Sequence, residues 1–232
     1  AVPLIGGIAT YCGLALALLL FADSSIEPLY YLACSGVIVV LGVFDDYLDL
    51  SVKLRLAVQT LVALAMSYSL NLHLDSLGNL FGFGVVELGV LGLPVTILAV
   101  IAAINAFNMT DGIDGLAGML SGVSFVSLTL MMGIGGQLEH ALLPMVLVFA
   151  LIPYLLFNLD VVGKGKGKIF MGEAGSMLIG LSVIWLLIIG TQSESASFRP
   201  VTALWIIAIP LMDMIAIMLR RIRKGQSPFQ AD

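Results

Sequence analysis

Acidic residues at the edges of long apolar stretches are the side chains of this sequence best suited to chemistry. Six carboxylates stand there: Asp45, Asp46, Asp49, Asp111, Asp114 and Glu173. A bilayer has no use for such a cluster of carboxylates, and ionisable residues within membrane spans are by default candidates for a functional site. Carboxylates gathered on one side bind hard cations, and Mg²⁺ is the usual companion of phosphates. The pattern predicts a site for a divalent cation and a phosphorylated substrate.

The first motif is VFDDYLDLSVKLR, residues 43–55. On a continuing helix, Asp45 and Asp49 would share a face one turn apart. Carboxylates this close repel one another unless a cation holds them, and Lys53 and Arg55 could neutralise phosphate oxygens. The competing interpretation is a solvated helix end, in which Asp49 pairs with Lys53.

The second motif, NAFNMTDGIDGLAG (residues 105–118), interleaves two side-chain amides and two carboxylates with glycine. The glycines let the backbone turn sharply and approach a ligand. Asn105, Asn108, Asp111 and Asp114 can coordinate a hard cation or bind hydroxyl groups. The competing interpretation is a turn whose Asp caps the next helix, which explains one carboxylate but not four polar groups.

The third motif, KGKGKIFMGEAGS (residues 164–176), alternates lysine with glycine before an apolar stretch. Lys164, Lys166 and Lys168 suit a loop that closes over a diphosphate. Phe170 offers an aromatic platform, and Glu173 lies where a helix N-terminus favours an anion. Taken alone, the motif is equally typical of a basic loop before a membrane helix.

The elements that must position these residues are membrane helices. The sequence of 232 residues is 60% hydrophobic and 11% charged, whereas soluble domains carry about 25% charged residues. A membrane helix needs roughly 20 mostly apolar residues. Eight stretches qualify: 4–21, 29–44, 56–72, 92–109, 116–134, 141–158, 175–191 and 201–219. We therefore expect an all-α polytopic membrane protein with eight spans in one domain, residues 1–232.

Threading the eight spans assigns every connection to one side of the membrane. Nine of the ten basic residues fall on one side, the exception being Arg199, so the positive-inside rule makes that side cytoplasmic. All three motifs lie there. On the other side, the glycine-rich connection 73–91 suggests a short hairpin or re-entrant turn, and we expect His73 and His140 to be ordinary interfacial residues.

The remaining features of the sequence say less about function. Cys12 and Cys34 lie in apolar spans and are expected to be core residues rather than a disulfide or metal pair. Asp213, inside the last span, could be functional or structural. The scattered basic residues do not indicate nucleic-acid binding. Because the sequence opens inside an apolar run without an initiator Met, we expect it to be part of a longer protein.

Together the motifs resemble those of the polyprenyl-phosphate N-acetylhexosamine-1-phosphate transferases. DDYLD, NAFNMTDGIDGLAG and IFMGEAGSMLIG match the blocks of that family in sequence and order. The stretch 201–229 resembles the bacterial WecA-like branch of the family rather than the MraY-like branch. In the WecA-like branch the chain continues into a histidine-rich cytoplasmic loop, which also suggests that this sequence is a fragment.

The resemblance implies a transferase of the bacterial cytoplasmic (inner) membrane, with its active site on the cytoplasmic face. It would move N-acetylglucosamine 1-phosphate from UDP-N-acetylglucosamine to undecaprenyl phosphate and release UMP. This would be the first membrane step in making a cell-surface glycan of the O-antigen or enterobacterial common antigen type. Mg²⁺ is the implied cofactor, Mn²⁺ could replace it, and a homodimer is compatible with the family.

The resemblance also implies residue roles. Asp45 would orient or deprotonate the lipid phosphate, and Asp46, Asn108 and Glu173 would hold or neighbour the metal. Asp111 and Asp114 would face the nucleoside, whose uracil would stack on Phe170. Substrate contacts are implied for Lys53, Arg55, Asn105 and Lys168. The family has Asp where this sequence has Glu173, and the extra methylene moves the carboxylate by more than about 1 Å.

Two other functions use some of the same features. A membrane prenyltransferase also binds a diphosphate through DDxxD and Mg²⁺, but it leaves the block at 105–118 unexplained. An ion-coupled transporter would place its carboxylates near the bilayer midplane, whereas all but Asp213 lie at one interface. The transferase is the function that the sequence favours.

Overall fold

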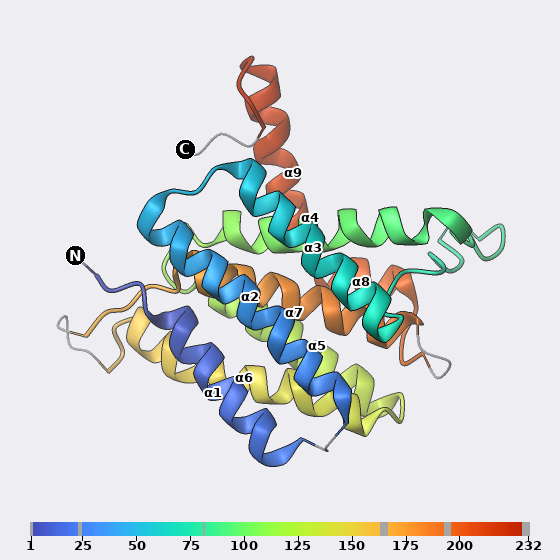
Figure 1. Ribbon diagram of the computed structural model, residues 1–232, viewed down its shortest axis with the longest axis horizontal. Coiled ribbons are helices and arrows are strands. Elements are labelled where there is room, and N and C mark those ends of the chain that lie inside the picture. Colours follow the sequence, from blue (N-terminus) through green and yellow to red (C-terminus); the bar gives the residue numbers. More distant parts are fainter. Residues whose placement is uncertain (1, 23–24, 81, 163–166, 193–195, 229–232) are drawn as a thin grey trace.

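The apolar stretches of the sequence are helical in the computed structural model, which describes residues 2–22, 25–80, 82–162, 167–192 and 196–228 (Figure 1). The helices are α1 (Gly6–Phe21), α2 (Ile26–Leu48), α3 (Val52–Leu70), α4 (Gly92–Thr110), α5 (Leu116–Ile134), α6 (Leu138–Asn158), α7 (Gly172–Gln192), α8 (Pro200–Ile206) and α9 (Ala208–Arg223), with a 3₁₀ turn at Gly89–Leu91. Each of the eight predicted stretches coincides with a helix, and the last is divided in two. The all-α prediction is confirmed for the described residues.

Five of these helices are long and apolar enough to cross a membrane: α2, α4 together with the 3₁₀ turn that precedes it, α5, α6 and α7. The bent pair of α8 and α9 makes six if it counts as one span. At 16 residues α1 is shorter, and α3 is less apolar because it carries Lys53, Arg55 and Gln59. These helices fit a multi-pass membrane protein, and the count of eight spans stays a prediction.

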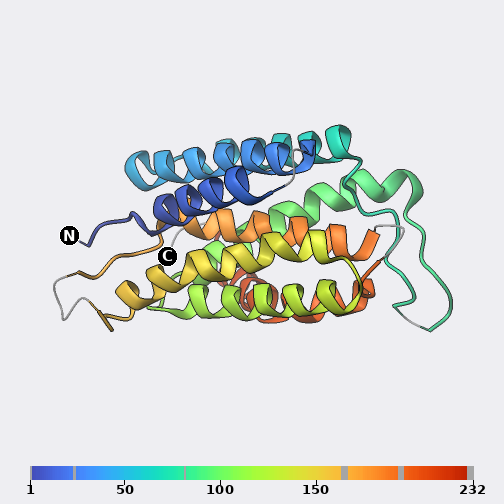
Figure 2. The ribbon, with the colours of Figure 1, turned by 90° about the horizontal axis from the view of Figure 1, so that it is seen from below.

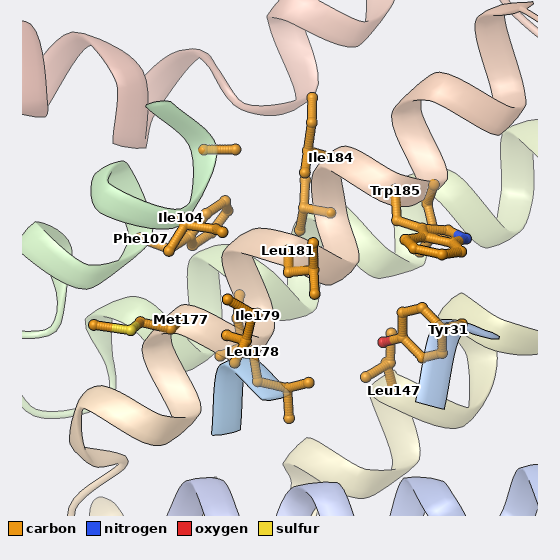
Figure 3. Close-up of a cluster of buried hydrophobic side chains, with 14 of the residues drawn as sticks. Tyr31, Ile104, Phe107, Leu147, Met177, Leu178, Ile179, Leu181, Ile184 and Trp185 are labelled. Atoms are coloured by element: carbon orange, nitrogen blue, oxygen red, sulfur yellow. The ribbon is translucent and has the colours of Figure 1, made fainter. Parts of the chain in front are cut away.

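Helix α7 forms the centre of the bundle and packs against α1, α2, α4 and α5. Its side chains are buried along nearly its whole length, and Figure 3 shows them interdigitating with those of neighbouring helices. The Tyr31 ring of α2 packs edge to face against Trp185 of α7, with 5.3 Å between the ring centroids. The Tyr31 hydroxyl lies 2.6 Å from Ser182 Oγ, so this buried polar group is also satisfied.

Small residues bring the helix backbones into contact around the start of α7. A Cβ atom added at Gly42 of α2 would lie 2.3 Å from the Ala174 Cα, and one at Gly7 of α1 would lie 2.2 Å from the Gly175 backbone nitrogen. Apolar burial gives little drive to helix association inside lipid, so close backbone packing supplies much of it. The two glycines let α1 and α2 approach the first turn of α7.

The last predicted span breaks between Ile206 and Ala208, where its two parts meet at 70°. Pro210 explains the break, because its ring excludes a helical hydrogen bond to the carbonyl four residues earlier. That carbonyl belongs to Ile206, and it accepts a hydrogen bond from Ser124 Oγ of α5 instead, at 3.1 Å. Beyond the break, α9 packs on α4.

The connections gather at two ends of the bundle. Figure 2 shows the chain's N-terminus and the segment before α7 at one end, and the 73–91 connection at the other. That connection contains the predicted hairpin: Ser76 and Glu87 form an isolated antiparallel bridge, and Leu77 donates to the Val86 carbonyl at 2.9 Å. His73 and His140 line one pocket at this far end, well removed from the carboxylate motifs.

The glycine contacts predict a pair of opposite outcomes. Gly42→Ala should lower the unfolding temperature, since overpacking costs about 1–3 kcal/mol, or roughly 2–10 °C for a chain of this size. Gly122→Ala is the matched control. It should raise the unfolding temperature slightly, because a Cβ there meets nothing within 4 Å and alanine has a higher helix propensity than glycine. Thermal unfolding in detergent measures both, and equal midpoints for the two variants would contradict the packing argument.

Candidate active site

One pocket, of about 310 Å³, lies where α2 and α4 end and α7 begins. Six of the predicted site residues line it, from all three motifs: Asp46, Asn108, Asp111, Asp114, Phe170 and Glu173. Leu4, Gly112, Ile113, Asn158, Gly172 and Ser176 complete the lining. Segments more than a hundred residues apart in the sequence therefore meet at one end of the bundle, as the threading predicted.

Asp45 and Asp46 point in different directions. Asp45 is buried, and its Oδ2 pairs with Arg55 Nη1 at 2.7 Å while its Oδ1 accepts from the Leu50 backbone at 2.8 Å. These bonds hold the turn between α2 and α3. The helix does not continue to Asp49, which takes a left-handed conformation (φ 48°) as the C-cap, so the predicted shared face of Asp45 and Asp49 is wrong. The ion pair that forms joins Arg55 to Asp45 rather than Lys53 to Asp49.

Asp46 caps α7 from the neighbouring helix. Its Oδ1 accepts a hydrogen bond from the Glu173 backbone N–H at 3.0 Å, at the helix end where a negative charge is stabilised. Its Oδ2 is buried without a hydrogen-bond partner. A buried, unsatisfied carboxylate oxygen is costly, and a bound cation would satisfy it.

Asn108 and Glu173, the predicted metal pair, are in direct contact. Asn108 Nδ2 donates to Glu173 Oε2 and to Ser176 Oγ at 3.0 Å. Arg55 Nη1 lies 3.9 Å from the same Glu173 oxygen, so the guanidinium group lies between the carboxylates of Asp45 and Glu173. The basic residue of the first motif thereby reaches the acidic residue of the third.

The donor set fits a magnesium ion that keeps part of its water shell. No group of three or more His, Cys, Asp or Glu side chains in metal-binding reach occurs among the described residues. Mg²⁺ usually binds one or two carboxylates and fills its octahedron with water and substrate phosphates. Asp46 Oδ2, Glu173 and the Asn108 amide could supply such a partial set of ligands.

Asp111 is surrounded by the other acidic side chains of the pocket, Asp46, Asp114 and Glu173. It caps the end of α4 and is half-buried. Burial raises the pKa of its carboxyl group to about 7, with further contributions from the negative charges of Glu173, Asp46 and Asp114. In the absence of a cation, this carboxyl group is therefore partly protonated near neutral pH.

Lys168, Phe170 and Asp114 form the outer wall of the site. Lys168 Nζ lies 2.5 Å from Asp114 Oδ2 and 5.3 Å from the centre of the Phe170 ring. The lysine thus joins the second and third motifs and covers one face of the ring on which a base was predicted to stack. Lys164 and Lys166, predicted to close over a diphosphate, lie outside the described residues.

Four of the five predicted substrate contacts do not line the pocket: Lys53, Arg55, Asn105 and Lys168. Asn105 Nδ2 donates to Gln59 Oε1 of α3 at 2.9 Å and to the Ile101 carbonyl at 2.8 Å. Lys53 is exposed at the start of α3. Their roles as substrate contacts stay predictions.

The family match settles what kind of protein has this site. Residues 28–191 match the family described as glycosyl transferase family 4. The chain belongs to this family. It is 50% identical over 232 residues to the undecaprenyl-phosphate alpha-N-acetylglucosaminyl 1-phosphate transferase of Salmonella typhi, covering all of this chain and 63% of that protein.

Other members with the same name are similar to a comparable degree. The protein of Escherichia coli K12 is 48% identical over 231 residues, all of this chain and 63% of the relative. The protein of Pasteurella multocida is 48% identical over 232 residues, all of this chain and 65% of the relative. This chain spans just under two thirds of the length of these glycosyl transferase family 4 members. The resemblance drawn from the three motifs is confirmed.

The motif analysis missed three polar residues of this family 4 site. Asn158 and Ser176 line the pocket, and Gln59 is fully buried beside Asn105. Ser176 follows Glu173 within the third motif, so its position was a usable signal. Asn158 and Gln59 are single polar residues at the end of, or within, an apolar stretch, where only the fold shows what they contact.

The raised pKa of Asp111 predicts a pH-dependent stability. Its folded-state pKa of about 7 exceeds the ordinary value of 3.8, so the protonated form is favoured in the fold, and this contribution is lost as the pH rises through 7. With EDTA present, the unfolding temperature should fall between about pH 4 and pH 7 and level off above pH 7, and Mg²⁺ should restore it. Asp111→Asn should flatten the curve, and an unchanged slope in that variant would show that another group titrates.

Proposed function

We propose that the protein containing this sequence transfers N-acetylglucosamine 1-phosphate from UDP-N-acetylglucosamine to undecaprenyl phosphate and releases UMP. One observation carries the proposal most strongly. A single pocket collects the polar residues of all three motifs, in a chain that is about half identical, along its whole length, to transferases named for this reaction.

In the proposed reaction, an oxygen of the lipid phosphate attacks the β-phosphorus of the nucleotide sugar. The bond from that phosphorus to the oxygen bridging the two phosphates breaks, and UMP leaves with the bridging oxygen. Phosphoryl transfer of this kind depends mainly on positioning and on neutralising charge. Mg²⁺, when bound, would neutralise the diphosphate and the leaving UMP.

The residues of the chain divide into a metal side and a nucleoside side. Asp46, Asn108 and Glu173 would hold the cation, because they converge at the start of α7. Asp111 and Asp114 would face the nucleoside together with Phe170, across the same pocket. Mn²⁺ could replace Mg²⁺ in an oxygen-rich site of this kind.

The Asp45–Arg55 pair would serve the lipid phosphate. Asp45 does not line the pocket, and it holds Arg55 so that the guanidinium group lies 3.9 Å from Glu173. Arg55 has five N–H donors, so it can pair with Asp45 and still contact a phosphate oxygen. Lys53, exposed nearby, would add positive charge at the membrane surface.

We further propose that the site faces the cytoplasm of a bacterial inner membrane through eight spans. Three of the described basic residues, Lys53, Arg55 and Lys168, lie at the end of the bundle that carries the pocket, which supports this orientation. A site at one end of the helices suits a lipid phosphate that meets a water-soluble nucleotide, and it does not suit a transport path through the midplane. The product would serve a cell-surface glycan, and a homodimer is compatible with the arrangement.

The proposal is tested by UMP release from UDP-N-acetylglucosamine, with Mg²⁺ or EDTA and with or without undecaprenyl phosphate. Release that requires both the cation and the lipid supports it. Release without the lipid would indicate a nucleotide-sugar hydrolase, release in EDTA would exclude the proposed metal, and no release would contradict the proposed activity.

Asp45→Asn should abolish lipid-dependent UMP release while UDP-N-acetylglucosamine still binds. The substitution removes the negative charge of Asp45, whose Oδ2 lies 2.7 Å from Arg55 Nη1 and holds the guanidinium group in place. The nucleotide pocket, which Asp45 does not line, keeps its shape. Calorimetry of nucleotide-sugar binding provides the control for folding. Wild-type turnover in this variant would remove Asp45 from the mechanism.

A further inference from the structure

Asn158, the last residue of α6, joins the two loops that form the nucleoside side of the pocket. Its Oδ1 accepts a hydrogen bond from the Gly115 backbone N–H at 2.6 Å, and its Nδ2 donates to the Ile169 carbonyl at 2.8 Å. The side chain is buried, with 3% of its surface exposed. One amide group therefore uses both of its polar atoms to connect two separate segments.

The two segments carry the residues on the nucleoside side. Gly115 ends the 111–115 turn, which holds Asp111 and Asp114, while Ile169 stands between Lys168 and Phe170. The second segment is also anchored at its other side: Phe170 N donates to the Pro3 carbonyl at 3.0 Å, and the Phe170 carbonyl accepts from Gly6 N at 3.0 Å. Asn158 supplies the corresponding anchor toward the 111–115 turn.

A second, weaker contact joins the 111–115 turn to the Lys168–Phe170 segment. The Lys168–Asp114 ion pair is partly exposed, at 33% and 48% of the side-chain surfaces, and exposed ion pairs contribute about 1 kcal/mol or less. The buried Asn158 hydrogen bonds are not exposed to competing water in the same way. They are therefore the main constraint on the gap between the turn and the aromatic ring.

We infer that Asn158 is a positioning residue that fixes the distance between the 111–115 turn and the Lys168–Phe170 segment, and thereby sets the affinity for the nucleoside end of the nucleotide sugar. This inference rests on the proposed function. It differs from a purely structural role, in which the bond to Gly115 would only support the start of α5 and the bond to Ile169 would not matter.

The first test separates binding from turnover. Asn158→Leu, similar in size but without polar atoms, should raise KM for UDP-N-acetylglucosamine roughly ten- to hundredfold, the equivalent of two buried hydrogen bonds. The kcat should stay within about threefold of wild type, because the contacts among Asp46, Asn108 and Glu173 do not involve Asn158. A loss confined to kcat would overturn the inference.

Asn158→Asp separates the two hydrogen bonds. The carboxylate can still accept from Gly115 N–H, but it repels the Ile169 carbonyl. If Asn158 positions the two segments, this variant should also raise KM. A wild-type KM would show that only the Gly115 contact matters, and the inference would fail.

Thr96→Val is the matched control. Thr96 is fully buried and also makes two hydrogen bonds, accepting from Leu74 N at 2.8 Å and donating to the Gly92 carbonyl at 2.8 Å, but it lies at the far end of the bundle. This variant should lower the unfolding temperature and leave KM unchanged. An equal rise of KM would mean that general destabilisation explains the effect.

A distance measurement keeps the inference distinct from the proposed function. Spin labels are attached at Ile113→Cys and Gly167→Cys, after the two native cysteines have been replaced by Cys12→Ser and Cys34→Ala. They measure the distance between the 111–115 turn and the segment before Phe170 without any substrate. The distance distribution should broaden in Asn158→Leu and Asn158→Asp but not in Thr96→Val. An unchanged distribution overturns the positioning role even if the transferase assay succeeds. Broadening in a protein that releases no UMP would contradict the proposed function and leave the structural link established.

Discussion

The site depends on the close backbone contact of α1 and α2 with the first turn of α7. Without side chains at Gly7 and Gly42, both helices come within van der Waals distance of Ala174 and Gly175. Only at that separation can Asp46 of α2 accept a hydrogen bond from the Glu173 backbone at 3.0 Å. The position of the Glu173 carboxylate, and through it Asn108 and Arg55, follows from this contact. A packing constraint in the apolar part of the bundle thus determines the geometry of its polar end.

The charges at that end are unbalanced in a way that suits a cation. Arg55 compensates Asp45, and Lys168 compensates Asp114. Asp46 has a buried oxygen without a hydrogen-bond partner, and Asp111 has a pKa raised to about 7 by burial and by its acidic neighbours. The fold tolerates this excess at neutral pH through partial protonation. A divalent cation would replace those protons and allow all of the carboxylates to ionise.

The sequence predicted the composition of the site better than its internal geometry. The helical stretches and the meeting of three motifs at one end follow from hydropathy and from the placement of basic residues, which are properties of each segment. The separation of Asp49 from the face of Asp45 could not be predicted, because it depends on where α2 ends. The break at Ile207 required Pro210 to act together with Ser124 of another helix. Asn158 gave no signal, because an amide at the end of an apolar helix gains its meaning only from the loops it contacts.

The central place of α7 has a consequence for the order of assembly. During synthesis α1, α2, α4 and α5 are made before α7, yet each of them packs against it. Until α7 is made, Gly7 and Gly42 lack the backbone that they contact in the finished bundle. The early helices therefore cannot reach their final arrangement by adding one to the next. The other helices take their final positions only after α7 has joined them, and the polar end becomes organised at that stage.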